Sequence, residues 1–300
     1  MELKGIFPIV PTPFDDDGTL DLASIDRLNT FMLQKGVNGL AVLGALGEGH
    51  KLDTDERSQV IERFRSNLPQ GIGLVVGVRA AATDLAVRMA RTAEKLGADA
   101  ILLGPLPVQN DAALSTYYQR CSASVDLPVI VHDYPAATGI FMTPDLIATL
   151  FRENQNIKYI KLEDPPTGPK MASVFEKTGH EIKIFGALGG MYAFEELDRG
   201  AVGIMTGFAY PELLVALFRR YRADDIAGAA TLFYDMLPLN RLEFQPGIGV
   251  SIRKQVFVKR GLFKTAYVRH PGQEADATTM AHVYRIVDHL KRRGYEMRDA

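Results

Sequence analysis

One lysine lies inside a segment whose other residues are typical of a buried strand. The segment NIKYIKLEDPP places Lys161 between two apolar residues, with Glu163 and Asp164 shortly after it. Burial disfavours the ammonium form and favours the neutral amine, which attacks a ketone to make a Schiff base. Three interpretations stay open from these residues alone. The lysine is a catalytic amine, it forms a structural ion pair with Glu163 or Asp164, or it reaches solvent at the strand end.

A second candidate site is the glycine-rich segment GALGEGHKLD, which begins at Gly44. Its glycines let the backbone approach a ligand closely, and successive N–H groups in such a turn can bind a carboxylate. Glu48 and His50 add polar side chains to the segment. The alternative is a loop that only turns the chain toward the next helix.

A third group consists of His132, Asp133 and Tyr134 in the segment VHDYPAATG. A single histidine is usually structural, but three polar side chains at the end of a strand indicate a functional site. Glu163, Asp164, His132 and Asp133 could supply oxygen and nitrogen ligands for a divalent cation. No HxH or HExxH spacing is present, however, and Lys161 would repel a cation, so we expect no metal.

The composition excludes several classes of protein. The 300 residues are 47% hydrophobic and carry a formal net charge of -2, without a basic run dense enough to follow a phosphate backbone. Cys121 is the only cysteine, so an internal disulfide is impossible. No segment approaches the roughly 18 apolar residues that span a bilayer, and the start of the chain has no secretory pattern. We expect a cytoplasmic protein with neither nucleic acid nor membrane as a partner.

Apolar runs alternate with segments of helical spacing along the chain. Near-continuously apolar strands flanked by helices predict a parallel sheet covered by helices, and eight such units predict an α/β fold of the (β/α)8 TIM barrel type. A dinucleotide-binding fold would need a glycine fingerprint where this chain has PTPFDDDG. The eight runs begin at residues 5, 37, 71, 99, 127, 157, 181 and 201.

The chain continues for about 80 residues beyond the eighth run. We expect residues 1–222 to form the barrel and residues 223–300 to form a C-terminal helical extension packed on it, because no linker rich in Gly, Ser or Pro separates them. Capping patterns indicate helix boundaries: starts at Asp53 with Glu56 and at Thr143 with Pro144, and ends at Gly36, Gly97 and Gly179.

These motifs together resemble the dihydrodipicolinate synthase/N-acetylneuraminate lyase superfamily of Schiff-base-forming barrels. The resemblance extends over nearly the whole chain. It includes GIFPIVPTPFDDDGTLD, the GxxGE loop at 44 to 48, YPAATG, YIKLED, FGALGG and GIMTG. It implies that Lys161 is the Schiff-base lysine and that the partner is a small 2-oxo acid. It also implies a homodimer or homotetramer that needs no metal or organic cofactor.

The resemblance also implies roles for other residues. We expect Lys161, His132, Glu163 and Tyr134 to be catalytic, with His132 or Glu163 transferring protons. The 2-oxo acid is expected to contact two further groups, one in the GxxGE loop and one at the ends of strands seven and eight. These substrate-binding candidates are Gly44, Ala45, Leu46, Gly47, Gly186, Met205 and Thr206.

Several positions depart from the superfamily pattern. Ala45 and Leu46 stand where pyruvate-using members usually have hydroxyl residues, which leaves backbone N–H groups to bind the carboxylate. His132 stands where the superfamily has its proton-transferring tyrosine, and Ala137 stands where dihydrodipicolinate synthases have an arginine. Dihydrodipicolinate synthesis is therefore not the expected reaction.

Within the superfamily, the chain is most similar to 2-keto-3-deoxy sugar acid dehydratases, particularly those acting on 2-keto-3-deoxy-arabonate. This similarity lies in the KxE motif at Lys161, in MTG followed by FAYPE, and in GIGVSIRKQVFVKRG. We expect a lyase, either a dehydratase or an aldolase, acting on a 2-oxo acid. Two alternatives remain: a dihydrodipicolinate synthase with an altered proton relay, and a non-catalytic barrel that binds keto acids.

Overall fold

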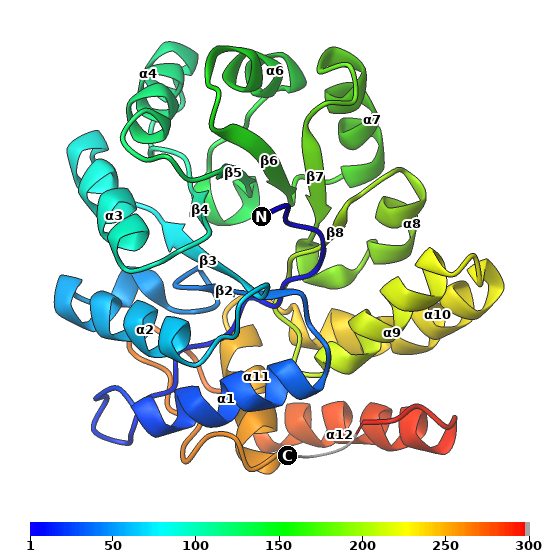
Figure 1. The fold of residues 1–300 in the computed structure, drawn as a ribbon. Coiled ribbons are helices and arrows are strands. Elements are labelled where there is room, and N and C mark those ends of the chain that lie inside the picture. The colour runs from blue at the N-terminus through cyan, green and yellow to red at the C-terminus, as the bar shows by residue number, and fades with distance from the viewer. Residues whose placement is uncertain (298–300) are drawn as a thin grey trace.

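The computed structural model describes residues 1–297, and its centre is an eight-stranded parallel sheet. The strands pair in the order β1-β8-β7-β6-β5-β4-β3-β2, and a parallel bridge between Ile9 and Ala41 joins the two edges. The sheet therefore closes into the predicted barrel (Figure 1). The strands are β1 Gly5–Ile6, β2 Gly39–Val42, β3 Gly73–Val78, β4 Ala100–Leu103, β5 Val129–Asp133, β6 Ile157–Leu162, β7 Lys183–Gly186 and β8 Gly203–Ile204.

Helices surround the strands, as the alternation of patterns predicted (Figure 1). Local capping explains where several of them begin: Asp53 and Glu56 form a full capping box, and the Thr143 side chain accepts from the backbone N–H of Leu146. The barrel helices are α1 Leu22–Gln34, α2 Thr54–Ser66, α3 Thr83–Lys95, α4 Asp111–Ser122, α5 Pro135–Thr138, α6 Pro144–Glu153, α7 Thr167–Lys177, α8 Ala193–Asp198 and α9 Pro211–Arg222. Short 3-10 turns lie at Gly49–Lys51 and Leu188–Gly190.

The strands separate two apolar clusters, one inside the barrel and one between the barrel and its helices. Strand β6 shows the alternation clearly, because Tyr159 belongs to the interior cluster whereas Ile160 and Leu162 belong to the outer one. Lys161 lies between Ile160 and Leu162, so its side chain points to the interior. The barrel therefore places the lysine among buried groups, as predicted from its neighbours.

Three helices follow the barrel: α10 Ile226–Glu243, α11 Gly249–Lys259 and α12 Ala277–Arg292. They lie together on one side of the barrel, near α1 and α9 (Figure 1). Buried ion pairs connect them to it, including Arg260 with Glu212 and Lys254 with Glu48, both at 2.6 Å. The boundary after residue 222 stays a prediction, since one apolar cluster includes residues on both sides of it. Among residues 1–297, no helix combines the length and apolar character needed to cross a bilayer.

Candidate active site

Lys161 lies on the wall of a cavity of about 420 Å³ at the carboxyl ends of the strands. The lysine is only 3% exposed, which excludes the interpretation that its ammonium group reaches solvent. The three predicted catalytic partners of Lys161 line the same cavity: His132, Glu163 and Tyr134. Residues 44–46 of the glycine-rich loop line it as well. Residues from three separate segments of the sequence therefore meet at one site, which is where barrel enzymes place their chemistry.

Three side chains form a compact polar group in this cavity. The Lys161 ammonium pairs with Oε2 of Glu163 and lies 3.3 Å from Nε2 of His132. The His132 Nε2 atom lies 2.7 Å from the same carboxylate oxygen. The remaining oxygen of Glu163 accepts a hydrogen bond of 3.1 Å from the backbone N–H of Leu188. The ion pair that sequence reasoning kept as an alternative is thus present, and it lies on the cavity wall.

Burial and charge set the protonation of this group. Burial lowers the pKa of Lys161, against the opposing attraction of Glu163. Burial alone would raise the pKa of Glu163, but Lys161 and the His132 hydrogen bond outweigh it and lower that pKa to about 2. Burial and the Lys161 charge lower the pKa of His132, against Glu163. The site therefore holds an ionised carboxylate, a neutral imidazole and a lysine that loses its proton more readily than usual.

The two residues that follow His132, at the end of β5 and directly after it, lie in different environments. The Tyr134 ring stacks on the imidazole at a centroid distance of 5.7 Å and lines the cavity, and burial raises the pKa of its hydroxyl to about 12. Asp133 is fully buried on the outer side of the strand, where it forms an ion pair of 2.7 Å with Lys170 of α7. Asp164 pairs with the same lysine at 2.8 Å. Of Asp133, Tyr134 and Asp164, Tyr134 is therefore the one placed to contact a ligand in the cavity.

The glycine-rich loop presents its backbone to the cavity. Within the described residues, the N–H groups of Ala45 and Leu46 donate to no protein acceptor, so they are available to a carboxylate. Glu48 does not line the cavity. Its buried carboxylate binds Lys254 at 2.6 Å and Lys51 at 2.9 Å, which fixes the end of the loop to the C-terminal helices.

The predicted substrate-binding residues divide into two groups. Gly44, Ala45, Leu46 and Thr206 line the cavity. Gly47, Gly186 and Met205 are not among its lining residues: Met205 belongs to the interior apolar cluster, and a Cβ added at Gly186 would meet the carboxylate of Glu196. A role for these three in binding stays a prediction. Among residues 1–297, no group of three or more His, Cys, Asp or Glu side chains has an arrangement suited to a metal ion.

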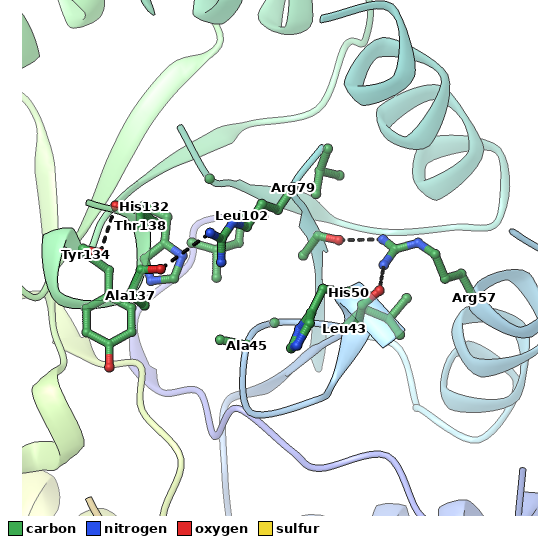
Figure 2. Close-up of a pocket in the computed structure, with 15 residues that line it drawn as sticks. Leu43, Ala45, His50, Arg57, Arg79, Leu102, His132, Tyr134, Ala137 and Thr138 are labelled. Atoms are coloured by element: carbon green, nitrogen blue, oxygen red, sulfur yellow. Dashed lines mark hydrogen bonds between the residues drawn. The ribbon is translucent and has the colours of Figure 1, made fainter. Parts of the chain in front are cut away.

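Sequence reasoning missed two ionisable residues near the site. Glu196 of α8 is 1% exposed, and burial raises the pKa of its carboxyl to about 8. No spacing signal marks it, because it lies on a helix. Arg79 follows β3 and lines a second compartment next to the Lys161 cavity (Figure 2). Its position at a strand's carboxyl end is a signal that could have found it.

The chain has many relatives in sequence and structure. Residues 2–290 match the Dihydrodipicolinate synthetase family. The chain is 28% identical to L-2-keto-3-deoxyarabonate dehydratase of Azospirillum brasilense, with 96% of this chain and 94% of that protein aligned. It is 31% identical to a protein of Escherichia coli named probable 2-dehydro-3-deoxy-D-pentonate aldolase YjhH, with 94% and 96% aligned.

Relatives named for dihydrodipicolinate synthesis are equally similar. The chain is 30% identical to 4-hydroxy-tetrahydrodipicolinate synthase of Methanosphaerula palustris, with 93% of this chain and 96% of that protein aligned. The crystal structure of a dihydrodipicolinate synthase from Rhodopseudomonas palustris superposes with a TM-score of 0.90 at 35% identity and covers 95% of this chain and 97% of that chain. The chain thus belongs to the dihydrodipicolinate synthetase family, whose members are lyases that form a Schiff base through a lysine.

Proposed function

We propose that this lyase acts on a 2-keto-3-deoxy sugar acid and that Lys161 forms the Schiff base. The observation that carries the proposal is the position of the Lys161 amine on the cavity wall, within 3.3 Å of the neutral His132 imidazole. The unbonded N–H groups of Ala45 and Leu46 supply a place for the carboxylate of a 2-oxo acid on the same wall. The relatives named as a dehydratase and an aldolase of deoxy sugar acids support the substrate class.

The reaction begins when the neutral Lys161 amine adds to the C2 carbonyl and the carbonyl oxygen leaves as water; the imine then takes up one proton from solvent. His132 then accepts a proton from C3, and the electron pair moves into the imine to give an enamine. In a dehydratase, the enamine expels the C4 hydroxyl group, which takes a proton from His132 and leaves as water. Hydrolysis of the remaining imine then releases the product and frees Lys161. Glu163 holds His132 and Lys161 in place and stabilises positive charge on either of them.

An aldolase would use the same imine but break a different bond. The C4 hydroxyl group would lose its proton, the C3–C4 bond would break, and its electron pair would form the enamine of pyruvate, with an aldehyde as the second product. Dihydrodipicolinate synthesis is a second candidate because relatives at 30% and 35% identity carry that name. Ala137, at the position where the resemblance expects an arginine, argues against it.

Trapping with borohydride tests the proposal. Incubation with pyruvate followed by reduction converts the imine to a stable secondary amine, which mass spectrometry of peptides locates. We expect the adduct on Lys161 and its loss in Lys161→Met. Lys158 is an exposed lysine of the same strand, so Lys158→Met is the matched control and should be trapped normally. An adduct that survives in Lys161→Met, or no adduct at all, would contradict the proposal.

Product analysis then separates the reactions. With 2-keto-3-deoxy sugar acids, loss of water without release of pyruvate identifies a dehydratase, and release of pyruvate with an aldehyde identifies an aldolase. Condensation of pyruvate with aspartate semialdehyde would instead favour the synthase. A trapped protein that turns over none of these compounds would favour the alternative of a barrel that binds keto acids without catalysis.

A further inference from the structure

A second compartment of about 480 Å³ adjoins the Lys161 cavity. Both spaces share five lining residues, which are Gly44, Ala45, Leu102, His132 and Tyr134. A molecule bound to Lys161 can therefore extend past His132 into this outer compartment. Figure 2 shows the outer compartment with Arg79, which follows β3, and His50, which lies in the 3-10 turn after β2.

The charged groups of the outer compartment are cationic. Among the described residues that line it, none is Asp or Glu, whereas Arg57 and Arg79 contribute guanidinium groups to its wall. Arg57 is held in the structure, because its guanidinium donates at 2.7 Å to the carbonyl oxygens of Gly49 and of Gly77 (Figure 2). The Arg57 group therefore shapes the wall and does not reach toward a ligand.

Arg79 differs from Arg57 in its contacts. It is exposed, and the only hydrogen bond that the structure assigns to its guanidinium within residues 1–297 is a long one of 3.4 Å to the carbonyl oxygen of Ala137 (Figure 2). No acidic side chain within that range forms an ion pair with it. Its charge nevertheless acts on the site. Burial and the charge of Lys161 lower the pKa of His132, and the charge of Arg79 lowers it further. Most of the N–H donors of Arg79, which lines the compartment, therefore lack a protein acceptor among the described residues.

We infer that Arg79 binds an anionic group at the far end of the 2-oxo acid that reacts with Lys161. The substrate is then a 2-oxo diacid, such as a 2-keto-3-deoxy sugar acid that ends in a carboxylate and not in a hydroxymethyl group. This inference rests on the proposed function, since it assumes that the carbonyl carbon is held at Lys161. A carboxylate accepts two parallel bonds from a guanidinium, and such charge-assisted bonds are about twice as strong as those to a neutral hydroxyl.

Trapping with paired probes tests this inference without knowledge of the natural substrate. The pairs are 2-oxoglutarate with 2-oxopentanoate and 2-oxoadipate with 2-oxohexanoate, which differ only in a terminal carboxylate. The measured quantity is the concentration that gives half-maximal borohydride trapping on Lys161. We expect the diacid to be trapped at a concentration at least about 10-fold lower than its partner in one pair or both.

Two variants connect the preference to Arg79. Arg79→Gln should abolish the preference for the diacid, because the diacid concentration for half-maximal trapping should rise to that of its monoacid partner. Arg88→Gln removes an exposed arginine of α3 that does not line either compartment, and it should keep the preference. Equal trapping of diacid and monoacid, or a preference that survives in Arg79→Gln, would overturn the inference while leaving the proposed function in place. Failure of pyruvate itself to be trapped on Lys161 would overturn both.

Discussion

Lys161 of β6 and His132 of β5 are register partners in adjacent parallel strands, and their side-chain nitrogens lie 3.3 Å apart. Side chains alternate between the two faces of a strand, so partners in register point to the same face. Both residues therefore point into the barrel, and the backbone pairing fixes the distance between the amine and the imidazole. This arrangement places a base beside the carbon that would be bonded to Lys161.

The first prediction concerns proton removal by His132. Enamine formation exchanges the methyl protons of bound pyruvate with solvent, so proton NMR in deuterated water measures the step directly. We expect His132→Asn to slow this exchange by about 100-fold or more, because it removes the base. The final yield of trapped pyruvate should be retained. His282→Asn, which changes an exposed histidine of α12, should exchange at the normal rate. Unchanged exchange in His132→Asn would exclude the imidazole as the base.

The second prediction concerns the pH at which Lys161 reacts. Burial lowers the pKa of this lysine and the Glu163 carboxylate opposes that effect. Glu163→Gln removes the opposing charge and keeps the burial, so the pKa of Lys161 should fall further. The pH of half-maximal trapping rate should therefore move to lower values, whatever happens to the maximal rate. Glu153→Gln, on the exposed face of α6, should leave the midpoint in place. A shift to higher pH would mean that burial does not control the amine.

The third prediction concerns the dependence of stability on pH. The pKa of Glu196 is raised by burial from 4.5 to about 8, so the folded state holds this proton where the unfolded chain does not. The resulting contribution is complete below pH 4.5 and is lost as the pH rises through about 8. One pKa unit corresponds to about 1.4 kcal/mol. The free energy of unfolding of the wild type should therefore fall between pH 5 and pH 9. This fall should exceed that of Glu196→Gln by on the order of several kcal/mol.

Urea unfolding at the two pH values measures this difference. Glu176→Gln, which changes an exposed carboxylate of α7, should follow the wild type at both. If the unfolding free energy of Glu196→Gln changes between the two pH values as much as that of the wild type, the prediction is wrong. The Glu196 carboxyl group would then be ionised in the folded protein at both pH values, as in the unfolded chain.

Much of the barrel could be predicted because its signals are local. The predicted helix boundaries at Asp53 and Thr143 are confirmed by their side-chain caps, and Gly36, Gly97 and Gly179 end helices with φ values of +76°, +87° and +60°. Such patterns depend on a few adjacent residues. The position of Lys161 followed from the alternation within its own strand, together with the rule that barrel strands end at the site.

The rest of the site depends on contacts between distant segments. Asp133 and His132 are adjacent in the sequence, yet one binds Lys170 outside the barrel and the other lies beside Lys161 inside it. Periodicity within one strand does not decide whether Asp133 or His132 points into the cavity. The pairing of β5 with β6 decides it. Glu196 is separated from Lys161 by a strand and a helix, so only the folded chain reveals that its carboxyl group is buried near the site.

The fourth prediction concerns the anchor of the glycine-rich loop. Glu48 is 1% exposed, and its carboxylate binds Lys254 and Lys51. Glu48→Ala leaves the buried Lys254 ammonium without its carboxylate, so we expect it to lower the free energy of unfolding by about 3–5 kcal/mol. It should also raise the pyruvate concentration for half-maximal trapping, because residues 44–46 lose the contact that holds their N–H groups toward the cavity. Glu62→Ala, on the exposed face of α2, should change neither quantity.

A double variant separates the two effects. Lys254→Met added to Glu48→Ala removes the uncompensated charge, so urea unfolding should recover part of the lost stability. The pyruvate concentration for half-maximal trapping should stay high, because the loop still lacks its anchor. If stability and trapping recovered together, the loss of binding in Glu48→Ala would be a consequence of partial unfolding. If only stability recovers, the ion pair between Glu48 and Lys254 positions the carboxylate-binding loop, and the C-terminal helices contribute to the site through it.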